Sequence, residues 1–125
     1  MTLYSADEVL CGLKDFQRAS VEHAFRRLYT DDDSSGRFLI ADETGLGKTM
    51  VAKGVIAKTI ERLQHDPSIT RIDIIYVCSN ADIAEQNLRK LTVTGNHRAT
   101  PATRLTTLIA QRQLLEATTP DGMKP

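Results

Sequence analysis

A short stretch near the middle of the chain places two glycines beside a lysine and a threonine, in the order Gly45, Leu46, Gly47, Lys48, Thr49. Glycines let main-chain N–H groups come close to an anion, because no Cβ stands in the way. Such N–H groups and the start of a following helix form a positive nest. A lysine beside the nest can reach the outer phosphates of a nucleotide, and a threonine hydroxyl can ligate magnesium. These residue types at this spacing predict a phosphate-binding loop.

The general pattern of such loops is a glycine, four free positions and then Gly-Lys-Ser/Thr. Gly47, Lys48 and Thr49 match the end of the pattern, whereas Asp42 stands in place of the first glycine. The alternative interpretation is a glycine turn with a lysine that faces solvent. The position of the stretch after an expected strand and before an expected helix favours the phosphate loop.

The elements that must position this loop alternate between helix and strand. Apolar spacing predicts helices over residues 14–29, 48–64, 81–91 and 105–116, and strands over 37–41 and 72–78. This order predicts an α/β fold with a parallel sheet and crossover helices. Two parallel strands make a poor sheet, because at least one flank of each lacks a partner, so we expect part of a larger domain.

Two residues refine this outline. Ser79 or Asn80 can cap the helix that follows the second predicted strand. Gly54 lies inside the helix predicted over 48–64 and costs it about 1 kcal/mol relative to Ala, which a tight packing contact would explain.

Composition narrows the class of protein but not its partner. The 125 residues are 41% hydrophobic and 26% charged, as in an ordinary soluble globular protein, and 16 basic residues balance 16 acidic ones. Cys11 and Cys78 have no paired spacing, which disfavours a disulfide framework or a zinc site and favours a cytoplasmic location. No apolar run approaches the ~20 residues of a membrane span, so no membrane partner is expected. The three histidines are scattered and form no catalytic triad or metal-ligand pattern.

Residues 41–49, Ala-Asp-Glu-Thr-Gly-Leu-Gly-Lys-Thr, resemble motif I of helicase superfamily 2, which includes the DEAD/DEAH-box and Swi/Snf-type helicases. The type III restriction-like branch is especially similar, because an Asp-Glu-x-Gly-x-Gly-Lys-Thr form is usual there. The resemblance implies a partial P-loop NTPase (RecA-like) three-layer fold with ATP and Mg²⁺ as cofactors. Lys48 and Thr49 would be catalytic, with Thr49 holding the magnesium. The implied cofactor-binding residues are Phe16, Gln17, Thr44, Gly45, Leu46, Gly47, Lys48, Thr49 and Met50.

In that superfamily a glutamine upstream of motif I, usually after an aromatic residue, recognises adenine. Phe16-Gln17 resembles this pair. An amide can donate to and accept from the edge of adenine at once. The alternative is an ordinary glutamine on a helix surface.

Residues 76–86 are similar to motif Ia, which faces nucleic-acid phosphate in the family. The residues expected at this interface are Ser79, Asn80, Gln86 and Arg89. Between Gln86 and Leu115 the chain has no acidic residue but carries Arg89, Lys90, Arg98, Arg104 and Arg112. The expected partner is therefore nucleic acid, with DNA preferred to RNA. An ordinary helix cap and a solvated basic face are the alternatives.

The family also needs an acid pair of the form Asp-Glu-x-His and a second motor domain with an arginine finger. Neither is found in this sequence. We therefore expect residues 1–36 to form a helical segment with the adenine-reading region and residues 37–125 an incomplete ATP-binding domain. The remainder of the motor is an expected partner, the chain is expected to be a truncated or split product, and alone it should be a poor ATPase. The alternatives are another P-loop ATPase, which Asp42-Glu43 and Phe16-Gln17 disfavour, and a non-catalytic remnant.

Overall fold

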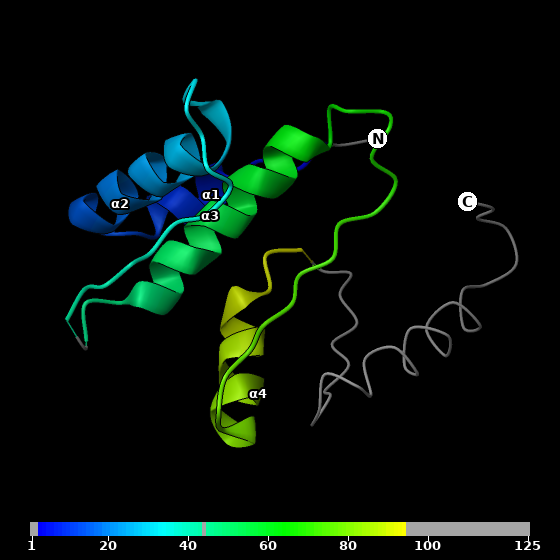
Figure 1. The fold of residues 1–125 in the computed structure, drawn as a ribbon. Helices are drawn as coiled ribbons and strands as arrows, with labels where there is room; N and C mark the ends of the chain where they lie inside the picture. Colours follow the sequence, from blue (N-terminus) through cyan, green and yellow to red (C-terminus); the bar gives the residue numbers. More distant parts are fainter. Residues whose placement is uncertain (1–2, 44, 95–125) are drawn as a thin grey trace, which may run out of the picture. The chain divides into compact units, whose positions relative to one another are not determined.

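The computed structural model describes residues 3–43 and 45–94. The chain divides into two compact units, residues 1–95 and 96–125, and all the described residues belong to the first. Its elements are α1 (Asp7–Cys11), α2 (Asp15–Phe25), a π-helix η1 (Arg26–Thr30), α3 (Lys48–Leu63) and α4 (Ala81–Leu91) (Figure 1). The predicted helix over 105–116 lies outside the described residues, and the predicted division at residues 36 and 37 stays a prediction.

The predicted helices over 14–29, 48–64 and 81–91 are all present, with small shifts at their ends. The first is α2 continued by the π-helix, in which Asp31 N–H donates to the Arg26 carbonyl at 2.9 Å. The third is capped as expected, because Asn80 Oδ1 accepts the N–H groups of Asp82 at 2.9 Å and Ile83 at 3.1 Å. The five-residue α1 was not predicted, because it is too short to show a helical period.

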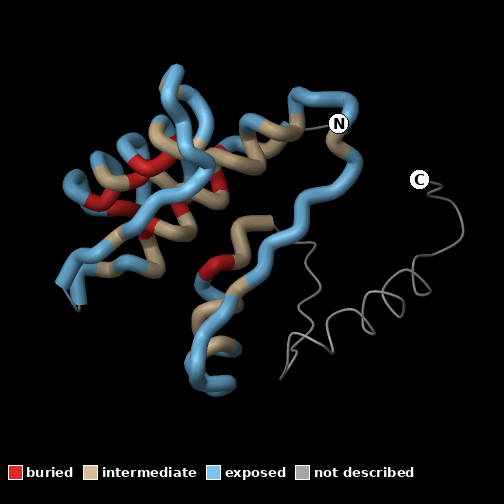
Figure 2. The backbone as a smooth tube through the Cα atoms, viewed as in Figure 1, coloured by how far each residue is buried: buried red, intermediate tan, exposed pale blue. Residues whose placement is uncertain are grey.

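The core lies between α2 and α3. Leu13, Val21 and Val51 are buried together, and Leu10, Ile40, Met50 and Val55 pack around them. Figure 2 shows the buried residues concentrated along these helices. The apolar residues whose spacing predicts the helix over 14–29 are not all buried, because Phe16 and Ala19 are exposed whereas Ala24 and Phe25 are buried.

Gly54 has the tight contact that its position predicts. A Cβ there would lie 2.6 Å from Val21 Cγ2 and 3.1 Å from Leu13 Cδ1. The absence of a side chain therefore lets α3 approach α2 closely enough to bury Val21 completely.

We expect Gly54→Ala to lower the free energy of unfolding by about 1 kcal/mol, because overpacking costs about 1–3 kcal/mol and exceeds the helix-propensity gain of about 1 kcal/mol. Chemical denaturation measures the change. The matched control is the same substitution in a Val21→Ala background, where the clash is relieved and Gly54→Ala should be neutral or stabilising. Equal effects in both backgrounds would contradict the packing explanation.

The prediction of strands over residues 37–41 and 72–78 is wrong for the structure that is described. Between residues 3 and 94, apart from the undescribed position 44, no strand is formed, and residues 37–41 and 72–78 are irregular. A strand exists only when a neighbour completes its hydrogen-bond ladder. Neither segment has one among the described residues, so Leu39, Ile75 and Val77 expose 83%, 73% and 74% of their surface. The α/β architecture is therefore not present in the described part, which consists of helices and loops.

The chain ties its amino-terminal segment to the end of α3. The Gln64 side chain accepts the Tyr4 N–H and donates to the Tyr4 carbonyl, both at 2.7 Å. Ala6 N–H donates to Glu61 Oε1 at 3.1 Å. This Tyr4–Gln64 clasp joins residues far apart in sequence and holds the segment that leads into α1 against α3.

Residues 72–78 expose apolar side chains on a segment that forms no strand. Such a segment can pair with the same segment of another chain, so we expect the chain to self-associate as its concentration rises. The double substitution Ile75→Lys, Val77→Lys should shift sedimentation velocity profiles toward monomer. Ile83→Lys, at a 50% exposed apolar position on α4, is the control and should change self-association much less. A wild-type chain that stays monomeric throughout would contradict the expectation.

Candidate nucleotide site

The predicted phosphate loop leads directly into α3. Gly47 is the N-cap of α3 with φ 80°, and Gly45 has φ 93°. Both values lie in the left-handed region, which glycine adopts without strain. The Gly47 carbonyl accepts the N–H groups of Met50 at 2.9 Å and Val51 at 3.2 Å, which begins the helix. Thr44 lies outside the described residues.

Lys48 folds back over the same loop. Its Nζ donates to the main-chain carbonyls of Asp42 at 2.7 Å and Glu43 at 3.2 Å. The lysine contacts these two acidic residues through their backbone. The exposed ammonium is thus held at the rim of the loop, and Thr49 follows in the first turn of α3, half-buried.

The predicted adenine pair separates into one exposed and one buried side chain. Phe16 is 46% exposed, whereas Gln17 is only 8% exposed. The Gln17 amide accepts the Lys14 N–H at 3.0 Å and donates to the Leu46 carbonyl at 3.1 Å. The structure therefore brings Gln17 against the phosphate loop. Sequence reasoning missed the contact with the Lys14 backbone, which Gln17 makes as the third residue of α2. A glutamine at this position is half of a capping box, but Lys14 lacks the Ser or Thr oxygen that makes the full signal recognisable.

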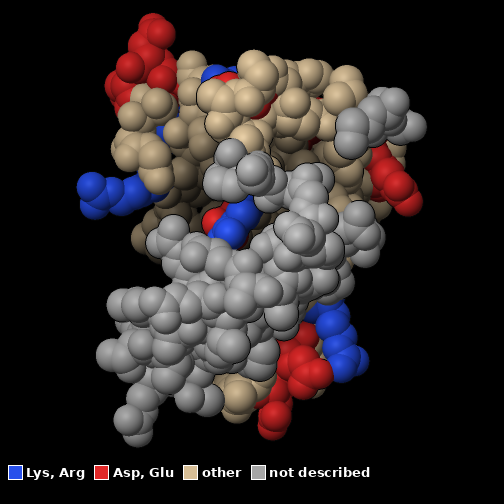
Figure 3. All heavy atoms as spheres, turned by 90° about the vertical axis from the view of Figure 1, so that its right-hand side faces the viewer, with Lys and Arg blue, Asp and Glu red and all other residues tan. Residues whose placement is uncertain are grey.

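Two of the predicted nucleic-acid residues precede α4 and two lie within it. Ser79, Asn80, Gln86 and Arg89 are all exposed. The Asn80 side-chain oxygen is occupied by the helix cap, and Arg89 donates to Glu85 at 2.6 Å. On the face drawn in Figure 3, acidic and basic side chains of the described residues both reach the surface. Arg98, Arg104 and Arg112 lie outside the described residues.

The chain matches the family model of the type III restriction enzyme, res subunit, over residues 10–118. The chain belongs to this family. The match confirms the predicted resemblance and includes both Gln17 and the loop before α3. No curated protein and no solved structure matches the chain.

Membership of the res-subunit family establishes a helicase-type region that binds ATP. Proteins of this family act on nucleic acid and generally use ATP with Mg²⁺, and the family implies a RecA-like P-loop fold. Among the described residues no helix combines the length and apolarity needed to cross a membrane. The same residues include no group of three or more His, Cys, Asp or Glu that could hold a metal ion. The assignment of Thr49 as a magnesium ligand stays a prediction.

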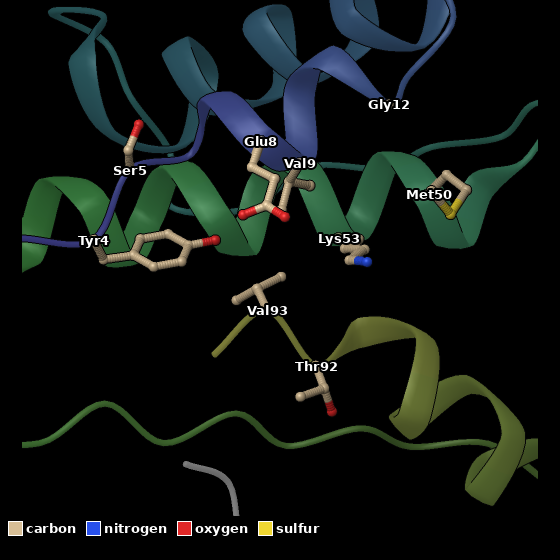
Figure 4. Close-up of a pocket in the computed structure, with 9 residues that line it drawn as sticks. All are labelled: Tyr4, Ser5, Glu8, Val9, Gly12, Met50, Lys53, Thr92 and Val93. Carbon is tan, nitrogen blue, oxygen red and sulfur yellow. The ribbon is translucent and has the colours of Figure 1, made fainter. Parts of the chain in front are cut away.

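A cavity of about 320 Å³ lies elsewhere in this res-subunit chain. It is lined by Tyr4, Ser5, Glu8, Val9, Gly12, Met50, Lys53, Thr92 and Val93 (Figure 4). The Tyr4 hydroxyl is buried and has no hydrogen-bond partner among the residues that the structure describes. Burial is the main cause that raises the pKa of Tyr4, and the negative charges of Glu61 and Glu8 raise it further. Only Met50 belongs both to this lining and to the predicted nucleotide site, so the cavity is not the phosphate loop.

Proposed function

We propose that this chain is the ATP-binding segment of a helicase or translocase that acts on nucleic acid, with DNA preferred to RNA. Residues 42–49 bind the β- and γ-phosphates, and Lys48 is the cation that contacts them. Thr49 holds the magnesium ion, while Phe16 and Gln17 contact the adenine. Ser79, Asn80, Gln86 and Arg89 form the nucleic-acid interface.

One observation carries the proposal. The exposed side chain of Lys48 is held against the glycine loop that directly precedes the sixteen-residue helix α3. The residues fit a triphosphate on two grounds. Apart from Gly45 and its two chain neighbours, no described atom lies within 4 Å of the position of a Cβ at Gly45, so an anion has room beside the backbone. The N–H groups in the first turn of a helix lack intrahelical acceptors and attract negative charge.

Each side chain has a defined task in this arrangement. Lys48 exchanges its two carbonyl contacts for phosphate oxygens, which are stronger acceptors because they are charged. The glycines keep the main chain close to the phosphates, and α3 fixes the direction from which Lys48 and Thr49 approach. Magnesium, when bound with ATP, neutralises charge on the phosphates.

The direct test is calorimetric titration of the chain with ATP in the presence of magnesium. Saturable binding of one nucleotide per chain, weakened when magnesium is removed, is the expected result. A chain that gives no saturable binding of ATP at millimolar concentrations would overturn the proposed function.

A further inference from the structure

The Gln17 amide forms two hydrogen bonds that fix its orientation. Its oxygen accepts the Lys14 N–H at 3.0 Å, and its nitrogen donates to the Leu46 carbonyl at 3.1 Å. The Lys14 N–H needs an acceptor, and the Leu46 carbonyl needs a donor. Exchanging the oxygen and the nitrogen of the Gln17 amide would therefore break both bonds. Gln17 thereby connects the start of α2 to the middle of the phosphate loop.

The bond to Leu46 determines which way the loop backbone faces. In a trans peptide the C=O of Leu46 and the N–H of Gly47 point in opposite directions. When the Leu46 carbonyl points to Gln17, the Gly47 N–H points away from it. The loop also passes very close to the amide, because a Cβ on Gly47 would lie 2.4 Å from Gln17 Nε2.

The same amide retains capacity for a nucleotide base. A glutamine side chain has two N–H groups and an oxygen with two lone pairs, and the two bonds use one of each. One donor and one acceptor remain, which is the pair that an adenine edge requires. In hydrogen-bonding capacity alone, contact with the loop leaves room for contact with adenine.

We infer that Gln17 is a positioning residue for the phosphate loop, acting through the Leu46 carbonyl to hold the Gly47 N–H toward the phosphate side. This inference rests on the proposed function and extends it. A residue that only reads adenine affects ligands that carry the base. A residue that positions the loop also affects binding of a triphosphate that has no base.

The test compares ATP with inorganic tripolyphosphate, each titrated with magnesium into the full chain by calorimetry. Gln17→Glu keeps an oxygen for the Lys14 N–H but cannot donate to the Leu46 carbonyl. Gln17→Met fills the same space without polar atoms and without charge. Both variants should bind tripolyphosphate roughly tenfold more weakly, which is typical of a lost buried hydrogen bond.

The matched control is Gln64→Glu. Gln64 also accepts an N–H and donates to a carbonyl through its amide, but at Tyr4, and it is not a member of the loop. It should leave the affinity for tripolyphosphate unchanged. Because Gln17→Met is neutral, weaker binding by both Gln17 variants cannot come from repulsion between a new carboxylate and the phosphates.

Thermal unfolding of each variant shows the temperature range in which it stays folded, and the titrations are done inside that range. Unchanged tripolyphosphate affinity in both Gln17 variants, with weaker ATP binding, would overturn the positioning role and leave Gln17 as an adenine contact alone. A wild-type chain that binds neither ligand would instead overturn the proposed function.

Discussion

Lys48→Ala is expected to abolish measurable ATP binding while leaving the fold nearly unchanged. Hydrogen bonds to charged groups contribute about 1.5–3 kcal/mol each, so losing two phosphate contacts weakens binding roughly 100- to 10,000-fold. The fold should tolerate the change, because Lys48 is exposed and the buried residues of α3 are Val51, Gly54 and Ala57. Calorimetry gives the affinity, and circular dichroism gives the helix content.

Lys53→Ala is the matched control for this substitution. Lys53 lies on the same helix and carries the same charge, but it is outside residues 42–49. Its replacement should change ATP affinity far less than Lys48→Ala does, because Lys53 lies more than one turn further along α3. Equal ATP affinities in Lys48→Ala and the wild type would show that the loop does not bind the phosphates.

The second large effect concerns catalysis by the 125-residue polypeptide alone. Phosphoryl transfer depends on charge stabilisation and on a positioned water, and an arginine finger alone contributes about 10³–10⁵ in rate. The sequence has no Asp-Glu-x-His motif to position water. We therefore expect the polypeptide to bind ATP but to release phosphate no faster than its Lys48→Ala variant.

The measurement is steady-state phosphate release at saturating ATP, with and without single-stranded DNA. The Lys48→Ala variant provides the background, because any contaminating ATPase is present in both preparations. Phosphate release that depends on Lys48 and reaches several turnovers per second would contradict this expectation. It would mean that residues other than an Asp-Glu-x-His pair position the water.

Local signals in the sequence predicted most of the helical structure. Asn80 specified the start of α4, because a side-chain oxygen that caps a helix acts over two or three residues. Gly54 indicated a close contact, since a glycine inside a helix is retained where a Cβ would clash. The phosphate loop was also recognisable from a local signal, because its glycines, lysine and threonine are adjacent in the chain.

The strands could not be predicted correctly because a strand depends on a partner. The mostly apolar, β-branched residues 72–78 favour a buried strand. Nothing in that segment specifies which other segment would pair with it. The role of Gln17 was hidden for a related reason. Its contact with Leu46 exists only because α2 packs on α3, and a pattern along one helix cannot reveal the geometry between two.

The Tyr4–Gln64 clasp has a consequence for biosynthesis. Tyr4 and Gln64, the two ends of the clasp, enclose in sequence every residue that shapes the loop. These residues are Lys14, Gln17, residues 42–49 and α3. Domains begin to fold during synthesis, from the amino terminus onward. The nucleotide loop can therefore take its shape on the nascent chain once Gln64 has left the ribosome, before the apolar residues 72–78 have met any partner.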